Sequence, residues 1–176
     1  MNLWHDLEPG DSHQINVIIE LPAGSKNKYE IDKATGLIAL DRTTHTTQAF
    51  PFDYGFIPQT LWDDNDPVDV ILLATFPFLP GVLVRGRPVA VMHMTDDGES
   101  DDKVIAVPVG DPRWEKTTDL KDINPHTLKE MEHFYSTYKK LQNKEVRITG
   151  FDGRAAADLM FERGKKLYVD KYLPKK

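Results

Sequence analysis

The sequence predicts a mainly β fold with α, that is, an α+β protein whose β sandwich or barrel carries two helices on its outside. The first two-thirds contain short apolar or alternating runs separated by Gly and Pro turns. The last third contains two helix-like patterns. Hydrophobic residues make up 40% and charged residues 28% of the 176 residues, a balance typical of globular proteins. We therefore expect a single domain over residues 1–176.

The predicted strands begin with the apolar run at residues 15–21. Residues 28–32 alternate between charged and apolar side chains, as in a strand with one exposed face. The turn-forming segment Lys33-Ala34-Thr35-Gly36 follows, so residues 37–42 are expected to return as the second strand of a hairpin. Three more strands are predicted at residues 68–74, at 82–94 with Gly86 as a candidate break, and at 103–109.

Two helices are predicted near the end of the chain. Asn124 followed by Pro125 is a favoured helix start, because the Asn side chain caps free N–H groups and Pro fits the first turn. Apolar residues then recur every three or four positions at Leu128, Met131, Tyr135 and Tyr138. The second helix, over residues 154–169, has a weaker signal because Gly164 lies inside it.

Composition limits the classes of function. A net charge of -6 disfavours nucleic-acid binding through phosphate neutralisation. The absence of cysteine excludes disulfides, thiolate metal sites and a cysteine nucleophile. No secretory signal is apparent, and the uncharged stretch at 70–84 is shorter than the roughly 20 residues of a membrane-spanning helix. We expect a soluble cytoplasmic protein that binds neither nucleic acid nor membrane.

Acidic residues cluster in two short windows. Residues 63–69 contain four aspartates and residues 96–102 contain five acids, and neither window contains a base. Two solvated acidic turns would explain this composition equally well, because Asp, Asn and Gly favour turns. The first window is harder to explain as a solvated turn, because Pro67 prevents a helix and the segment leads directly into an apolar strand.

Carboxylates gathered at the start of a buried strand repel one another, so a cation is needed to offset their charge. Two of them about 5 Å apart repel by about 3 kcal/mol at an effective dielectric constant near 20. Zinc is disfavoured because the six histidines are scattered. An EF-hand calcium loop is disfavoured because Val68 stands where a further ligand is needed. Magnesium, which takes few carboxylates and keeps waters and phosphate oxygens, fits best.

Other chemistries find little support. The sequence contains no GxGxxG motif, no P-loop and no GxSxG motif. Ser100 lies within the second acidic window, where a turn residue is a better interpretation than a nucleophile.

With its acidic windows and apolar strands, the sequence resembles the family I soluble inorganic pyrophosphatases, in their short prokaryotic form. The segment Asp64-Asn65-Asp66-Pro67-Val68-Asp69-Val70 fits the D-x-D-P-x-D signature of that family. Further matching segments occur in family order between residues 15 and 150, namely 17–22, 28–32, 41–42, 51–55, 94–96, 101–103, 106–108 and 138–139. The resemblance implies a small closed OB-like β-barrel with two flanking helices, and hydrolysis of pyrophosphate to two phosphates.

The resemblance also implies roles for individual residues. Asp64, Asp69 and Asp101 would bind a first magnesium ion, and Asp69 would help to hold a second. Asp66 would act as general base for the attacking water. Asp96 and Asp101 would bind a third ion and Glu30 a fourth, with Glu20 acting through water. The phosphoryl groups would be gripped by Lys28, Arg42, Tyr54, Lys103, Tyr138 and Lys139.

The number of ions follows from charge. The seven acids and four bases of this predicted site carry a net charge of about -3, to which pyrophosphate adds its own negative charge. Three or four magnesium ions then bring the site close to neutrality, whereas two leave it clearly negative. The resemblance further implies a homohexamer. The apolar segment at 70–84 hints at the same, because it offers more apolar surface than one small barrel must bury.

One position departs from the family pattern. Phe50 stands just before the Pro51-x-x-Tyr54-Gly55 segment, where the family commonly has a tyrosine, so we exclude it from the site. The roles of Asp97 and Asp102 stay open: they flank the candidate ligands and either support them or only face solvent. Two alternative functions also stay open: a magnesium-dependent phosphohydrolase acting on a nucleotide or polyphosphate, and a non-catalytic barrel that binds ions or a partner.

Overall fold

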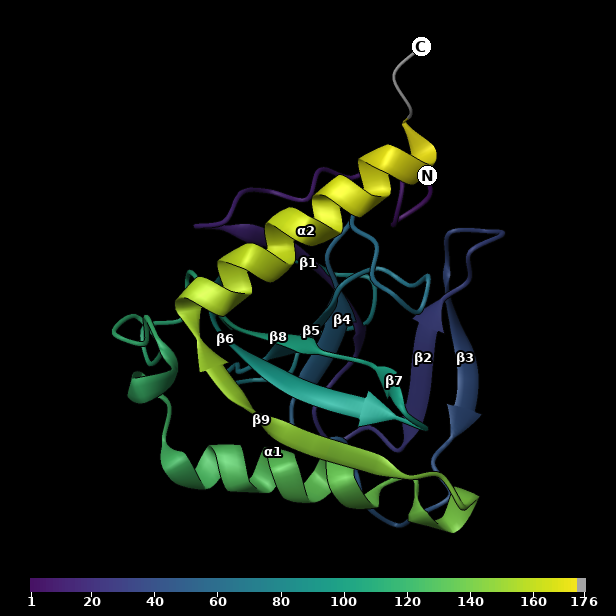
Figure 1. The fold of residues 1–176 in the computed structure, drawn as a ribbon, viewed down its shortest axis with the longest axis vertical. Helices are drawn as coiled ribbons and strands as arrows, with labels where there is room; N and C mark the ends of the chain where they lie inside the picture. The colour runs from purple at the N-terminus through teal and green to yellow at the C-terminus, as the bar shows by residue number, and fades with distance from the viewer. Residues whose placement is uncertain (174–176) are drawn as a thin grey trace.

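A computed structural model describes residues 1–173 of the chain, and the last three residues of the predicted domain 1–176 lie outside the described residues. Figure 1 shows a ring of strands between two helices. The ring consists of β1 (Ile15–Leu21), β4 (Asp53–Phe56), β5 (Asp69–Leu72), β8 (Lys103–Pro108) and β6 (Leu83–Asp96), and β6 pairs back with β1. The β5–β8 pair is parallel, and the other pairs in the ring are antiparallel. The mainly β, closed architecture with two flanking helices is confirmed.

The predicted break at Gly86 is wrong. Strand β6 runs without interruption through this residue, which pairs with Ile15 of β1 and Pro108 of β8. A Cβ atom on Gly86 would lie 3.3 Å from Val17 Cγ2 and 3.4 Å from the Cβ of Ala106. The glycine therefore permits close packing inside the ring rather than ending the strand.

A hairpin stands beside the ring as a separate two-stranded sheet, as the sequence predicts. It pairs β2 (Asn27–Ile31) with β3 (Ile38–Thr43) in antiparallel register. Its turn is held by Asp32 Oδ1, which accepts a hydrogen bond from the backbone N–H of Thr35 at 2.7 Å. Gly36 completes the turn with a φ of 73°, a conformation that glycine adopts at little cost.

Three strands were not predicted from the sequence: β4, β7 (Glu99–Ser100) and β9 (Val146–Gly153). Strand β9 pairs along β6 and carries the chain between the two helices. Its sequence mixes polar residues and glycines with few apolar positions, so it lacks a clear alternating pattern.

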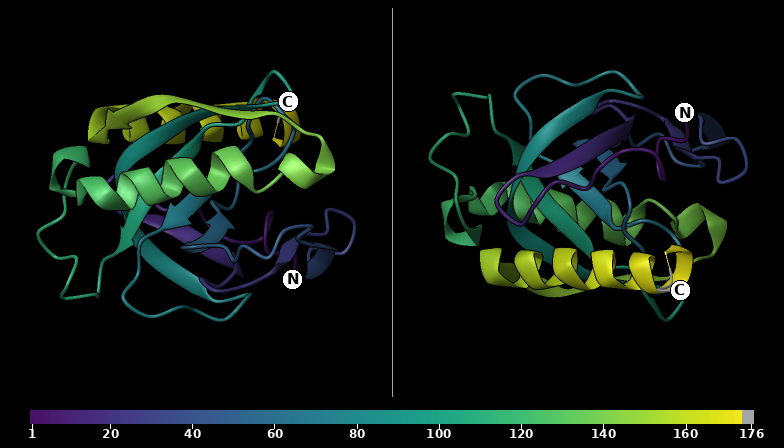
Figure 2. Two further views of the ribbon diagram at one scale, coloured as in Figure 1. Left: turned by 90° about the horizontal axis from the view of Figure 1, so that it is seen from below. Right: turned by 90° about the horizontal axis from the view of Figure 1, so that it is seen from above.

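Both predicted helices are present. Helix α1 (Pro125–Thr137) packs against β9, and Asn124 Oδ1 accepts from the backbone N–H of His126 at 2.9 Å, which confirms the predicted cap. Helix α2 (Arg154–Tyr172) extends three residues beyond its predicted end and packs against β6 and β9. Figure 2 shows the two helices on the outside of the strands. Short 3-10 turns occupy Leu120–Asp122 and Lys140–Gln142. Among the described residues, no helix is both long and apolar enough to cross a membrane.

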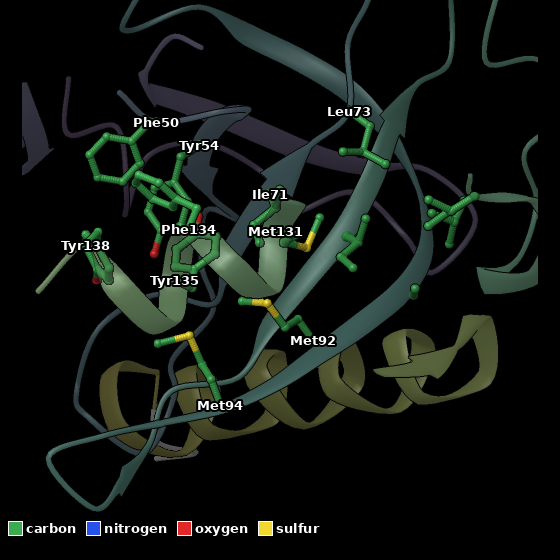
Figure 3. Packing of buried hydrophobic residues seen from close by; sticks show 14 of the residues in the cluster. Phe50, Tyr54, Ile71, Leu73, Met92, Met94, Met131, Phe134, Tyr135 and Tyr138 are labelled. Atoms are coloured by element: carbon green, nitrogen blue, oxygen red, sulfur yellow. The ribbon is translucent and has the colours of Figure 1, made fainter. Parts of the chain in front are cut away.

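Aromatic side chains connect α1 to the strand ring (Figure 3). The ring of Phe50 lies 5.0 Å from that of Phe134 and 6.0 Å from that of Tyr138, measured between ring centroids. Tyr54 of β4 and Tyr135 of α1 belong to the same buried cluster. Because these aromatic contacts bury large surfaces, they fix the C-terminal half of α1 against the ring.

Candidate active site

The ends of three neighbouring strands meet at one edge of the ring. Strands β5 and β8 are parallel, so their first residues, Asp69 and Lys103, lie at the same end. Strand β6 is antiparallel to β8, so its last residue, Asp96, lies at that end too. Residues far apart in the sequence are thereby brought together.

A cavity of about 250 Å³ opens at this end. Every site residue predicted from the sequence lines it except Arg42. Arg42 lies on β3 directly opposite Lys28 of β2 and pairs with its neighbour Asp41. The cavity lining is completed by Ile31, Lys33, Phe50, Pro67 and Tyr135.

The first acidic window forms a tight corner before β5. The backbone N–H of Trp62 donates to the carbonyl of Asp66 at 2.7 Å, and the N–H of Asp66 donates to Asp64 Oδ1 at 3.0 Å. Asn65 reaches a φ of 66° between them, which an Asn tolerates better than most residues. Burial, and then the charges of Asp69 and its neighbours, raise the pKa of Asp64 to about 6. The corner thus carries a carboxyl group that is costly to ionise without a cation.

Lys103 lies between two carboxylates. Its Nζ is 2.7 Å from Asp69 Oδ2 and 2.8 Å from Asp101 Oδ1, and the side chain is only 3% exposed. Burial opposes the charged form of this lysine, but Asp101 and Asp69 outweigh it and raise the pKa of Lys103. Burial also raises the pKa of Asp101, although Lys103 acts in the opposite direction. One ammonium group therefore does not fully compensate two buried carboxylates.

Glu20 lies at the deep side of the cavity. Its Oε1 accepts a hydrogen bond from the backbone N–H of Ile31 at 2.7 Å, and the residue is 3% exposed. Burial, followed by the charge of Asp69, raises the pKa of Glu20 well above its ordinary value. This bond also ties β1 to the β2–β3 hairpin, which brings Lys28 and Glu30 to the cavity.

Two further lysines of the cavity lining also pair with carboxylates. Lys28 pairs with Glu30, and Lys139 pairs with Asp96. Burial lowers the pKa of Lys139, and the nearby charges of Lys28 and Arg42 lower it further against the opposing effect of Asp96. These cations repel one another when the cavity holds no anion, so an anionic ligand here would be stabilised.

The donor chemistry suits a hard cation, although the side chains are not arranged around one. In residues 1–173 no three acidic or histidine side chains form a ready metal-binding group. The carboxylates are paired with lysines instead: Lys103 bridges Asp69 and Asp101, Lys33 pairs with Asp66, and Lys139 pairs with Asp96. One oxygen is left over: Asp96 Oδ1 is buried and accepts no hydrogen bond. Carboxylates with raised pKa values and an unpartnered buried oxygen fit magnesium well.

Two cavity residues escaped the sequence analysis. Lys33, assigned to a turn, pairs with Asp66 and also donates to the carbonyl of Asn65 at 3.3 Å. Tyr135, assigned to the apolar face of α1, is 3% exposed, and burial raises its pKa well above the ordinary value. Phe50, excluded because it lacks a hydroxyl group, contributes a buried ring to the cavity wall. Lys33 and Tyr135 reach the cavity only in the folded structure, because a turn residue and a residue on the apolar face of a helix give no sequence signal for it.

The two acids left open by the sequence lie outside this cavity. Asp97 Oδ1 accepts from the backbone N–H of Glu145 at 3.2 Å, which ties one exposed turn to another. Asp102 instead contacts His93 and the backbone of Met94.

Comparisons with known proteins show the family to which the chain belongs. Residues 17–169 match the sequence profile of a family described as inorganic pyrophosphatase. The soluble inorganic pyrophosphatase 1 of Arabidopsis thaliana is 45% identical over 95% of this chain and 80% of that protein. The inorganic pyrophosphatase of Haloferax volcanii is 46% identical over 98% of this chain and 99% of that protein. The crystal structure of the inorganic pyrophosphatase from Thermus thermophilus aligns with a TM-score of 0.91 and 40% identity, over 96% of this chain and 99% of that one. The chain therefore belongs to the inorganic pyrophosphatase family, as its sequence resemblance predicts.

Proposed function

We propose that this protein hydrolyses inorganic pyrophosphate to two phosphates in the 250 Å³ cavity, with magnesium as its cofactor. The observation that carries the proposal is the mixture of charges around the cavity. Its lining combines aspartates of the 64–69 corner and Asp101 with the lysines Lys28, Lys103 and Lys139. A small, highly charged anion needs both kinds of side chain, since its own charge requires lysines and its bound cations require carboxylates.

The magnesium ligands in this proposal are six acids: Asp64, Asp69, Asp96, Asp101, Glu20 and Glu30. Asp64, Asp69 and Asp101 would hold one ion, Asp69 would reach a second, and Asp96 would contribute its unpartnered Oδ1. Bound magnesium supplies charge neutralisation and makes water a better nucleophile near neutral pH. The charge of the assembled site favours three or four ions with substrate. Lys103 and Lys139 would release their carboxylate partners and turn toward phosphate oxygens.

Asp66 is proposed as the general base. Its side chain is 46% exposed, compared with 20% for Asp69, so solvent water reaches it more easily. It would accept a proton of the attacking water as the water oxygen bonds to one phosphorus, while the bond from that phosphorus to the bridging oxygen breaks and the second phosphate leaves with the bridging oxygen. Lys33, which pairs with Asp66 here, must move aside for this step.

The remaining predicted residues would orient and neutralise the phosphoryl groups. Lys28, Arg42, Lys103 and Lys139 supply positive charge, which stabilises the departing phosphate. Burial raises the pKa values of Tyr54 and Tyr138, so both hydroxyl groups stay protonated at neutral pH and donate hydrogen bonds to phosphate oxygens.

We also propose a homohexamer and a cytoplasmic location, both by analogy with the short prokaryotic members of the family. Exposed apolar side chains in the 70–84 segment support self-association, because Phe76 is 69% and Leu79 is 75% exposed.

Phosphate release tests the proposed activity. Purified protein with magnesium is expected to release two phosphates per pyrophosphate and far less phosphate from ATP. Comparable turnover of ATP would favour the broader phosphohydrolase. An absence of turnover with either substrate would favour a non-catalytic binding protein, and full activity in excess chelator would exclude the metal requirement.

A further inference from the structure

Asp101 and Asp102 interrupt regular strand pairing beside the cavity. Strand β6 pairs with β8 as far as Met92 opposite Lys103, and with β7 from Thr95 opposite Ser100. The two aspartates lie between β7 and β8 and belong to neither strand. The ladder alone therefore does not fix the orientation of Asp101, whose carboxylate lines the cavity.

The side chain of Asp102 makes one of two hydrogen bonds that join this segment to β6. Its Oδ1 accepts a hydrogen bond from the backbone N–H of Met94 at 3.1 Å. The carbonyl of the same Met94 accepts from the backbone N–H of Asp101 at 3.0 Å. Two successive aspartates are thus held to one residue of β6, one through its side chain and the other through its backbone. The Asp102 side chain is only 20% exposed, which protects these bonds from competing water.

His93 fixes the carboxylate of Asp102 from the other side. Its Nδ1 lies 2.8 Å from Asp102 Oδ2, and its Nε2 lies 3.1 Å from Asp152 Oδ2 on β9. An imidazole donates through both nitrogens only when it is protonated. Burial would lower the pKa of His93, but Asp102 and then Asp152 raise it above the ordinary value.

A second basic residue of this region is engaged elsewhere. Arg163 of α2 lines the same small pocket of about 220 Å³ as His93 and Asp102. Its guanidinium group instead stacks on Trp62 at 4.3 Å and pairs with Asp63 at 2.6 Å. His93 is therefore the basic side chain that contacts Asp102.

We propose that Asp102, oriented by His93, is a positioning residue that places the Asp101 carboxylate for magnesium binding. The inference rests on the proposed role of Asp101 as a magnesium ligand. Asp102 does not line the catalytic cavity and acts through the backbone that it shares with Asp101. Partners that orient metal ligands typically change metal affinity by about 10- to 100-fold when they are removed.

Titration calorimetry of the substrate-free protein with magnesium chloride tests the proposal, alongside phosphate-release kinetics. Asp102→Ala is expected to weaken magnesium binding by about tenfold or more and to shift the magnesium dependence of the rate in parallel. Asp102→Asn keeps an oxygen for the Met94 N–H and is expected to lose much less. Asp152→Asn is the matched control, because Asp152 contacts the other nitrogen of His93 and is 69% exposed. It should bind magnesium as the wild type does.

Two results would contradict the positioning role of Asp102. Magnesium affinity in Asp102→Ala within about twofold of wild type, or an equal loss in Asp152→Asn, would overturn the positioning role. If Asp102→Ala does not fold, His93→Ala takes its place, because it removes the orienting ring and leaves the bond to Met94. An unchanged magnesium affinity in that variant would count equally against the proposal. Wild-type protein that hydrolyses pyrophosphate without binding magnesium would instead refute the metal assignment in the proposed function.

Discussion

Gly164 on α2 supports the corner that carries Asp64 and Asp66. A Cβ atom at this position would lie 2.5 Å from Val68 Cγ2 and 3.4 Å from the Cβ of Thr60. The carbonyl of Gly164 also accepts from the backbone N–H of Leu61 at 3.0 Å. Gly164→Ala therefore cannot be accommodated unless the helix moves away from residues 60–68.

The expected size of the effect follows from two opposing contributions. Alanine in a helix is favoured over glycine by about 1 kcal/mol. Overpacking against a buried side chain costs about 1–3 kcal/mol, and Val68 is fully buried with a short, stiff side chain. We expect a net loss of up to about 2 kcal/mol in the free energy of unfolding, and a drop of about 2–4 °C in Tm for each kcal/mol lost.

Urea denaturation and calorimetry measure this loss, and Lys166→Ala is the matched control on the exposed face of the same helix. Because the displaced corner carries proposed magnesium ligands, Gly164→Ala should also need more magnesium for half-maximal activity. A variant at least as stable as the wild type, with an unchanged magnesium requirement, would refute the packing argument.

Three further predictions concern charge, a missing hydroxyl group and assembly. Burial raises the pKa of Asp64 to about 6, so ionisation of this residue destabilises the metal-free fold as pH rises through about 4 to 6. Without magnesium, Asp64→Asn should therefore raise Tm at pH 7 but not below pH 4. A lower Tm of this variant at pH 7 would contradict the prediction. Phe50→Tyr should fold and change the rate by about fivefold or less, the value of one hydrogen bond, and a collapse of activity in folded protein would disprove it. Light scattering should give a hexamer at micromolar concentration. Phe76→Asp should weaken this assembly because Phe76 is 69% exposed. A stable 20.1 kDa wild-type monomer would contradict the hexamer and the role of Phe76.

The sequence allowed much of the strand ring to be predicted, because β1, β5 and β8 are nearly continuous apolar runs. Strand β4 is only four residues long, and β9 is polar, so neither has a periodic pattern. Gly86 was misread as a break in its strand, and Gly164 weakened the prediction of a helix that is present. Both look like weak points in isolation, yet a Cβ atom would lie 3.3 Å from Val17 Cγ2 at Gly86 and 2.5 Å from Val68 Cγ2 at Gly164.

The 64–69 corner of the candidate site was predictable, because its acidic residues lie within one short segment of the sequence. Contacts across the fold were not predictable. Lys33 meets Asp66 only because the hairpin turn lies over that corner, and Tyr135 reaches the cavity only because α1 packs against the ring. His93 and Asp102 are nine residues apart, and only the irregular β6–β8 connection makes them partners.

The most direct test of the central claim is the rate of phosphate release against magnesium concentration and pH for Asp66→Asn and Asp69→Asn. If Asp66 is the base and Asp69 a metal ligand, Asp66→Asn should lose about 10²- to 10⁴-fold in rate, keep its magnesium affinity and recover partly at high pH. Asp69→Asn should bind magnesium more weakly and recover partly in excess magnesium. If magnesium rescues Asp66→Asn instead, or if both variants respond alike, the assignment of base and ligand in this cavity is wrong.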